Sequence, residues 1–258
     1  MKLRRTPSTP LAVAILSIVT LASGACSSGA GREHNRLATQ ADTGSYAAAV
    51  LADQPVAYWR LGESAGNQAV DSSGNGFSGS YVNGPTFGVP GAIVGDPDTA
   101  ISMTGPPADA YVAIPDAPSL ELTTDFSLEA WIFQTSSNGN GFRLIDKEIA
   151  GLATATGYDL DTYGAGLGAG GGNGHQLRIC GGYIGGVANC VNADTPFSLN
   201  AWHHVAVTVT GGIATFYLDG RPDGSRSAGQ FLQGDLDLRI GAPHLGCGGS
   251  CGLSSMRS

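Results

Sequence analysis

Short runs of β-branched and aromatic residues, bounded by Gly, Pro, Asn or Asp, recur along the chain after residue 56. Such runs are typical of β-strands, because these side chains pack well on a pleated sheet and the bounding residues favour turns. Ten runs fit this description: 57–61, 100–103, 111–114, 126–133, 142–145, 158–160, 177–180, 202–210, 213–218 and 236–240. Strands in this number and at this spacing predict an all-β, two-sheet antiparallel sandwich.

The alternation of apolar and polar positions is clearest around Gly211-Gly212, a pair that supplies the positive φ angles of a tight hairpin turn. Pairing Thr210 with Ile213 brings six apolar residues to one face. These residues are Val205, Val207, Val209, Ala214, Phe216 and Leu218. We expect this face to lie in the core, while the opposite face, which carries His204, is either ordinary outer surface or the lining of a groove or second layer.

One helix is predicted. The stretch from Ser45 to Gln54 is rich in Ala and ends at Pro55, which cannot continue a helix. Its length allows two or three turns.

The N-terminus has the layout of a bacterial export signal. Lys2, Arg4 and Arg5 precede an apolar run from Leu11 to Ala22. As a helix this run spans about 18 Å, which is short of the roughly 30 Å of a bilayer core, so a permanent membrane span is the poorer interpretation. We predict that residues 1–25 are a signal peptide and that the protein is exported.

The residues that follow predict a lipid anchor. The stretch Leu21 to Cys26 resembles a lipoprotein lipobox, in which the cysteine is lipidated and becomes the mature N-terminus, although Ser23 stands where lipoproteins prefer Leu. Simple cleavage after Ala25, with Cys26 left free, is the alternative. Residues 26–44 are small and polar and predict a tether.

The cysteine count agrees with export and lipidation. The chain has five cysteines, and an exported protein seldom keeps an unpaired thiol. Lipidation of Cys26 leaves four, for which the simplest pairing is local: Cys180 with Cys190, and Cys247 with Cys251 in a Cys/Gly-rich tail, 246–258. Zinc at the second couple is a weaker alternative, because no second pair of ligands matches it.

Composition bounds the function. The chain has 258 residues, of which 42% are hydrophobic and 13% charged, with a formal net charge of −8. This is enough apolar material for one folded domain and too acidic for a general nucleic-acid binder.

Five blocks resemble the bacterial laminin-G-like, concanavalin-A-like jelly-roll family. They are YWRLGE at 58–63, DSSGNG at 71–76, SLEAWI at 127–132, WHHVAV at 202–207 and FYLDG at 216–220. The resemblance covers about residues 46–243 and implies a jelly-roll domain over 45–245, placed outside the cell. It also implies binding of glycans or surface proteins, or a purely structural role as a spacer.

The sequence departs from this family near its end. Members continue past the block that stands here at 238–241 into a final strand, which closes the sheet beside the first strand. Residues 242–251 do not have such a pattern. We therefore expect a sandwich that lacks its closing strand and exposes a sheet edge, as a marginally stable monomer or an edge-paired dimer.

Catalysis is not expected. A jelly-roll glycanase needs two carboxylates on one sheet face, and the Glu-x-Asp-x-x-Glu run of the glucanases that this family resembles is absent. The closest approximation is Asp125 with Glu129. We predict a binding or interaction module that is not an enzyme, with a concanavalin-A-like glycoside hydrolase or a truncated structural domain as alternatives.

Candidate binding residues are few. The loop 71–76 offers the oxygens that calcium prefers, chiefly from Asp71 and Asn75, although its composition is also that of an ordinary turn. Calcium is the one cofactor that the sequence brings forward. Five aromatic residues either stack on sugars or belong to the core. They are Tyr58, Trp59, Trp131, Trp202 and Tyr217.

Overall fold

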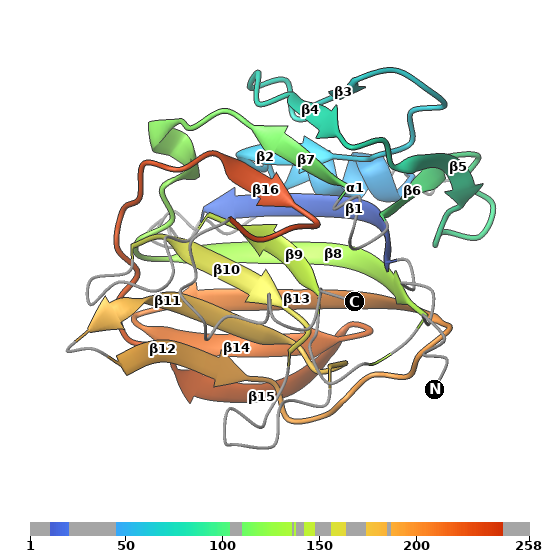
Figure 1. Cartoon of the computed structure of the whole chain (residues 1–258). Helices are drawn as coiled ribbons and strands as arrows, with labels where there is room; N and C mark the ends of the chain where they lie inside the picture. Colours follow the sequence, from blue (N-terminus) through green and yellow to red (C-terminus); the bar gives the residue numbers. More distant parts are fainter. Residues whose placement is uncertain are drawn as a thin grey trace, which may run out of the picture.

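The computed structural model confirms the all-β class, with two antiparallel sheets packed face to face (Figure 1). It describes residues 11–20, 45–103, 110–135, 137, 142–147, 156–163, 174–184 and 187–244. The predicted tether at 26–44, with Cys26, and the tail at 246–258, with Cys247 and Cys251, lie outside the described residues.

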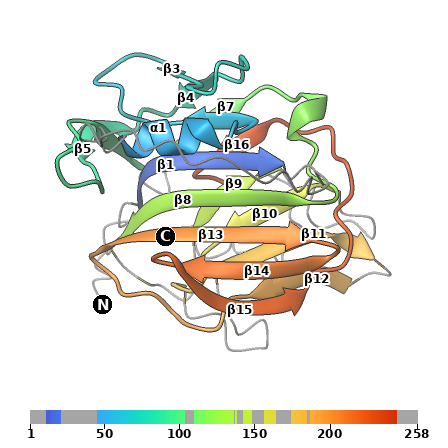
Figure 2. The ribbon, with the colours of Figure 1, turned by 180° about the vertical axis from the view of Figure 1, so that it is seen from behind.

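Eight strands form the first sheet. They are β1 (Leu11–Thr20), β2 (Ala57–Trp59), β5 (Thr86–Pro90), β6 (Thr99–Met103), β8 (Phe126–Gln134), β13 (Trp202–Thr210), β14 (Ile213–Leu218) and β15 (Arg221–Ser227). Their order is β15-β14-β13-β8-β1-β6-β5, and β2 also pairs with β1. Figure 2 shows β15, β14, β13, β8 and β1 as successive neighbours in this sheet.

Eight further strands form the second sheet. They are β3 (Gln68–Ala69), β4 (Gly79–Val82), β7 (Tyr111–Ile114), β9 (Arg143–Asp146), β10 (Tyr158–Asp161), β11 (Arg178–Ile184), β12 (Val187–Asn192) and β16 (Leu238–Ile240). Their order is β12-β11-β10-β9-β16-β7-β4-β3. A single 3-10 turn, η1 (Pro118–Leu120), precedes β8.

The core lies between the two sheets. Strand β8 illustrates why, because its residues alternate between fully buried and half-exposed positions along all nine positions. The inward residues Phe126, Leu128, Ala130 and Ile132 are 0% exposed and share one cluster with apolar residues of the second sheet. Alternation of period two thus assigns one face of β8 to the core.

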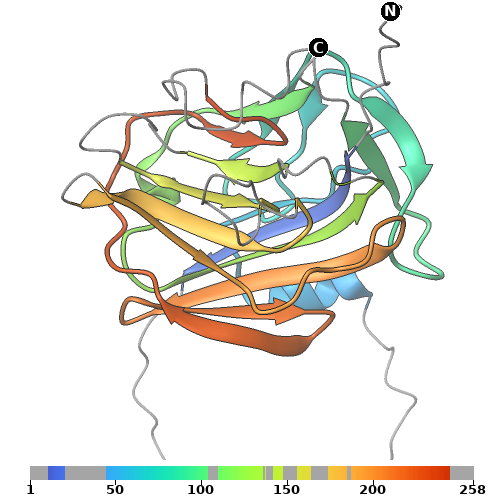
Figure 3. The same cartoon turned by 60° about the horizontal axis from the view of Figure 1, so that its bottom comes forward.

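The predicted helix is confirmed as α1 (Tyr46–Ala52), which is N-capped by the Ser45 side chain accepting from the N–H of Ala48 at 3.3 Å. Two buried apolar residues, Ala47 and Val50, pack it against the outer face of the first sheet. Figure 3 shows α1 outside this layer. Among the described helices, none is long and apolar enough to cross a membrane.

The predicted hairpin is also confirmed. Thr210 pairs with Ile213, and the register continues to Val205 opposite Leu218. Five of the six predicted core residues are buried, and Leu218 at the end of β14 is half-buried and packs against the core. The outer face is partly covered, because the Tyr46 hydroxyl of α1 lies 3.4 Å from His204 Nε2.

The structure differs from the expected open edge in two respects. The closing strand that the sequence analysis expects to be missing would lie beside β2, which is the first of the predicted strands. In the structure this position lies in the interior of the first sheet and not at its edge, and β1 occupies it. The segment in question, Leu11–Thr20, is part of the predicted signal peptide. A signal peptide and a buried strand both contain an apolar run of this length, and periodicity alone does not distinguish them.

The predicted disulfide between Cys180 and Cys190 is confirmed. The two cysteines lie directly opposite one another on β11 and β12, with Cα atoms 4.1 Å apart. The bridge therefore ties down the hairpin at the edge of the second sheet.

Breaking this bridge is expected to destabilise the domain. By closing this loop the bridge lowers the entropy of the unfolded chain, which adds about 2.8 kcal/mol to the free energy of unfolding. Loss of the bridge should therefore lower the melting temperature by roughly 5–10 °C. The measurement is a thermal melt of the Cys180→Ala/Cys190→Ala variant beside the native chain, each with and without reductant. A native melt that reductant does not shift would contradict the assigned role.

Candidate functional site

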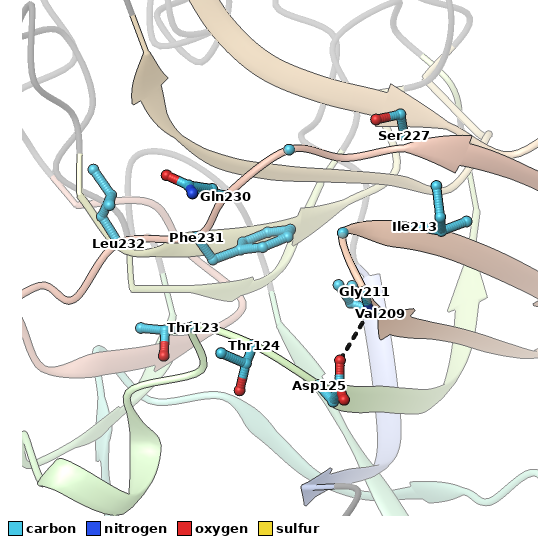
Figure 4. A pocket seen from close by; sticks show the side chains of 12 residues that line it. Thr123, Thr124, Asp125, Val209, Gly211, Ile213, Ser227, Gln230, Phe231 and Leu232 are labelled. Carbon is cyan, nitrogen blue, oxygen red and sulfur yellow. Dashed lines mark hydrogen bonds between the residues drawn. The ribbon is translucent and has the colours of Figure 1, made fainter. Parts of the chain in front are cut away.

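A cavity of about 760 Å³ opens at one end of the sandwich (Figure 4). Three segments distant in sequence build it: the residues before β8, the turn between β13 and β14, and the segment after β15. We call it the end pocket. It is lined by Thr123, Thr124, Asp125, Val209, Gly211, Gly212, Ile213, Ser227, Gly229, Gln230, Phe231 and Leu232.

Two hydrogen bonds, one from a backbone N–H to a side chain and one between backbone groups, hold these three segments in place. Asp125 Oδ1 accepts from the N–H of Gly211 at 2.9 Å, which ties the start of β8 to the hairpin turn. The carbonyl of Gly212 accepts from the N–H of Ala228 at 2.8 Å, which ties the same turn to the segment after β15. Both glycines have positive φ, as the turn requires.

Phe231 anchors the wall of the end pocket. It is 3% exposed and packs edge-to-face on Phe126, with ring centroids 5.1 Å apart. A Cβ at Gly181 would come within 2.5 Å of the Phe231 ring, so this position of β11 has room only for glycine. The second sheet thereby helps to shape the pocket.

The chemistry of the end pocket is mixed. Hydroxyl and amide groups come from Thr123, Thr124, Ser227 and Gln230, and Asp125 brings a carboxylate. Apolar surface comes from Phe231 and Val209, together with the exposed side chains of Ile213 (44%) and Leu232 (37%). None of the twelve described lining residues is Lys, Arg or His, which favours an uncharged ligand over an anionic one.

Of the residues that line the end pocket, sequence reasoning named only Asp125 as a candidate for chemistry, and named it as a weak catalytic acid. The structure separates Asp125 from Glu129. Asp125 directly precedes β8 and Glu129 is the fourth residue of that strand. Four residues of extended chain span roughly 13 Å, which exceeds the separation of a glycosidase pair. Glu129 instead lies under α1, with Oε2 at 3.6 Å from His204 Nε2.

A second polar group of side chains lies on the outer face of the second sheet. Arg143 contacts Asp159 at 2.5 Å and Asp161 at 2.6 Å, and Arg178 binds Asp161 through two nitrogens. His244 bridges Asp146 and Asp237 at 2.6 and 2.9 Å. We call this set the charged network.

The charged network is built to keep carboxylates ionised. Burial by itself raises the pKa of Asp161, but the guanidinium groups of Arg178 and Arg143 outweigh it and lower the pKa. A carboxyl in this state is a poor proton donor. The network therefore joins β9, β10 and β11, and Asp161 within it is not the raised-pKa acid that glycoside hydrolysis needs.

The structure gives the candidate calcium residues other partners. Asp71 Oδ1 accepts from the N–H groups of Tyr58 and Ser73 at 3.0 and 2.9 Å, and Oδ2 accepts from the N–H of Phe77 at 2.9 Å. The Asn75 amide donates to the carbonyl of Val56 at 3.0 Å. In the described part of the chain no group of three or more His, Cys, Asp or Glu could hold a metal. Calcium at this loop stays a prediction.

Of the five aromatic candidates, none lines the end pocket. Tyr58 and Trp59 are 0% exposed. Trp131 lies half-buried under α1, with its ring centroid 6.3 Å from that of Tyr46, and Trp202 packs on Phe133 at 5.6 Å. Burial also raises the pKa of Tyr58 to about 12. Tyr58, Trp59, Trp131 and Trp202 therefore serve packing, and Tyr217 of β14 is half-buried.

Comparison with known families assigns the chain. A laminin-G-type family model, described as the concanavalin A-like lectin/glucanases superfamily, matches residues 106–251, more than half of the 258 residues. The chain belongs to this family. A search of curated proteins finds no match.

Several solved structures are similar to this chain at low sequence identity. A carbohydrate-binding module, CBM66 from Bacillus subtilis, is 16% identical, with 51% of this chain and 73% of that chain covered and a TM-score of 0.32. Domain 4 of AbnA, an extracellular arabinanase from Geobacillus stearothermophilus, is 14% identical over 67% and 77%, with a TM-score of 0.44. The binding domain of botulinum neurotoxin serotype D/C is 13% identical over 71% and 43%, with a TM-score of 0.44. At these values the likenesses carry no conclusion about a ligand.

Asp71→Asn is expected to destabilise the fold by about 1–3 kcal/mol, because the amide NH₂ replaces an oxygen that accepts a backbone N–H. Burial raises the pKa of Asp71, but its hydrogen bonds from Ser73, Tyr58 and Phe77 outweigh it and leave the pKa lowered. A lowered pKa gives stability that is present above the unfolded value, near 3.8, and is lost as pH falls through the folded value.

The measurement is urea unfolding at pH 7 and near pH 3. The gap between the native chain and Asp71→Asn should narrow at the lower pH. Asp235→Asn, at an exposed position, is the matched control and should leave stability unchanged at both. An Asp71→Asn effect of the same size at both pH values would contradict the role given to the ionised carboxylate.

Proposed function

We propose that this protein is an exported, non-catalytic binding module whose end pocket holds an uncharged glycan. The observation that carries the proposal is the composition of the pocket, in which hydroxyl, amide and carboxylate groups surround apolar surface. A sugar ring needs both kinds of contact, because its hydroxyl groups form hydrogen bonds while its C–H faces pack on apolar side chains.

The size of the cavity supports this ligand class. Sites for small ligands have volumes of about 300–1,000 Å³, and the end pocket lies within this range. Its exposed rim residues, Ile213 and Leu232, offer the apolar contact, and Gln230 presents a side-chain amide. A short glycan or the end of a polysaccharide fits these dimensions better than a folded protein surface does.

The positions and the ionisation of the candidate carboxylates disfavour catalysis. Glu129, the acid that the sequence pairs with Asp125, stands four residues further along, roughly 13 Å in an extended chain, and Asp161 of the charged network is paired with arginines that favour its ionised form. Recognition without bond cleavage is therefore the function that we propose. A glycoside hydrolase is the alternative, and the same experiment addresses it.

The test is a glycan array with the full chain, followed by calorimetry on any glycan that binds. Gln230→Ala removes the pocket amide and should weaken binding about tenfold, since loss of one good hydrogen bond is worth about 1.4 kcal/mol. Asp125→Asn, which keeps an oxygen for the Gly211 N–H, should also weaken it. Gln233→Ala is the matched control at an exposed position outside the pocket.

Three outcomes would overturn the proposal. The first is an array that stays blank for a folded chain, and the second is an equal loss of affinity in Gln230→Ala and Gln233→Ala. The third is release of reducing sugar from a polysaccharide panel that Glu129→Gln abolishes, which would replace the binding module by a hydrolase.

We also propose that the module is held at the cell surface by a lipid on Cys26. The support is the sequence pattern of residues 1–26, together with the odd number of cysteines. Mass spectrometry of the protein from an exporting bacterial host should find a mature N-terminus at Cys26 carrying a diacylglyceryl group. An unmodified Cys26 would instead indicate a secreted, unanchored protein.

A further inference from the structure

Three hydrogen-bonded side chains form a group at the surface, outside the end pocket. Ser198 Oγ lies 2.8 Å from His203 Nε2, and His203 Nδ1 lies 2.8 Å from Asp219 Oδ2. Three separate segments supply them: the loop between β12 and β13, the start of β13, and the turn between β14 and β15. None of the three residues lines the end pocket. We call them the surface triad.

The backbone of β13 holds the carboxylate of Asp219 in place. Its Oδ1 accepts from the N–H of His204 at 3.0 Å, and the N–H of Asp219 donates to the carbonyl of His204 at 2.8 Å. Asp219 has a φ of 50°, in the left-handed region that Asp adopts more readily than most residues. One carboxylate oxygen thus fixes the side chain, and the other contacts His203.

Backbone hydrogen bonds fix the loop on both sides of Ser198. The N–H of Phe197 donates to the carbonyl of His175 at 2.9 Å, and the N–H of Asn200 donates to the carbonyl of the last residue of β8 at 2.8 Å. Phe197 is 3% exposed, and its ring centroid lies 5.6 Å from that of His203. These contacts keep the Ser198 hydroxyl beside the imidazole.

The partners of His203 determine where its protons lie. A carboxylate only accepts hydrogen bonds, so Nδ1 of the ring donates to Asp219, and Nε2 of the neutral ring accepts from the Ser198 hydroxyl. The carbonyl of Ser198 also lies 3.1 Å from Nε2. When Nε2 takes up a proton, this carbonyl accepts the new N–H, which favours transfer of the proton from the hydroxyl.

We propose that Ser198 is a nucleophile that accepts an acyl group from an activated ester. A serine becomes nucleophilic when it contacts a histidine that a carboxylate orients. Ser198 Oγ attacks the carbonyl carbon of the ester while its proton passes to His203 Nε2. The C–O bond to the alcohol then breaks, and His203 returns the proton to the departing oxygen. The products are O-acylated Ser198 and the free alcohol.

The surroundings of Ser198 indicate the class of acyl donor. Ser198 is exposed, and the side chain of Asp219 nearby is 49% exposed, so its negative charge disfavours an anionic donor and leaves an uncharged ester. The reaction modifies each chain once and needs no turnover, so it is compatible with a module that does not cleave glycans. It is also independent of the end pocket, and a glycan array does not test it.

The test treats the full chain with p-nitrophenyl acetate and, separately, with a fluorophosphonate probe. In the second reaction a P–O bond to Ser198 Oγ forms, the P–F bond breaks, fluoride leaves and the proton passes to His203. Intact-mass spectrometry counts the adducts and peptide mapping locates them. The phosphonate adduct records the reaction even where water removes the acetyl group.

Variants separate the chemistry from a structural role. Ser198→Ala should lose the adduct. Asp219→Asn should slow labelling about tenfold or more, because an amide that donates to Nδ1 holds the ring in the wrong tautomer. His203→Ala should slow it as much and recover in part with added imidazole, which a structural role of the ring does not predict. Ser225→Ala is the matched control, since Ser225 is exposed on β15 and its hydroxyl contacts Thr215 at 3.0 Å instead of a histidine.

We expect one adduct per folded chain, on Ser198, and none on the chain unfolded in urea. Circular dichroism verifies that each variant is folded, and if His203→Ala does not fold, Ser198→Ala and Asp219→Asn decide the result. The proposal is overturned by a folded native chain that takes up neither reagent, by labelling of Ser225 as frequent as that of Ser198, or by an unchanged labelling rate in Asp219→Asn.

Discussion

The structure depends on β8 having a hydrogen-bonded neighbour along both of its sides. Strand β13 pairs with one side at eight positions and β1 with the other at nine. The inward residues of β8 are fully buried, so its backbone groups have no access to water as alternative partners. A strand in the position of β1 and a closed core are thus one requirement, and the end pocket shares it because Asp125 stands directly before β8.

Ion pairs stabilise the second sheet on its outer face. On the outer face of the second sheet, the charged network places arginines between aspartates, so that each charge withdrawn from water has a partner of opposite sign. Lys147 follows the same rule at the end of β9. It is 0% exposed and contacts Asp116 and Glu121, each at 2.6 Å. Apolar packing holds the inner faces together, whereas paired charges join the strands of the second sheet on their outer side.

The sequence predicted the elements whose signal is local. The Gly211-Gly212 turn, the alternation along 202–218, the helix that begins after Ser45, and the Cys180–Cys190 bridge were all readable from neighbouring residues. The strands that it missed have weak local signals. Strand β15 (Arg221–Ser227) has no apolar alternation, and β5 (Thr86–Pro90) contains Gly and Pro, because strands at sheet edges tolerate such residues.

Two features were beyond the sequence for a different physical reason. The end pocket brings together residues near 124, 211 and 230, and no periodic pattern in the sequence predicts that these segments lie side by side. The role of Leu11–Thr20 in the sheet depends on which position the rest of the fold leaves unfilled, and this is a property of the complete sandwich. Asp71 is an intermediate case. The sequence shows that it lies in a turn, but it does not show which three backbone N–H groups donate to its carboxylate.

Residue-resolved amide hydrogen exchange along β8 in the full chain tests the central claim most directly. If β8 is paired on both sides, all its interior amides should exchange as slowly as those of β13, including alternate residues that face β1. Slow exchange only at the amides that face β13, with the alternate ones exchanging as fast as those of the edge strand β15, would contradict the account.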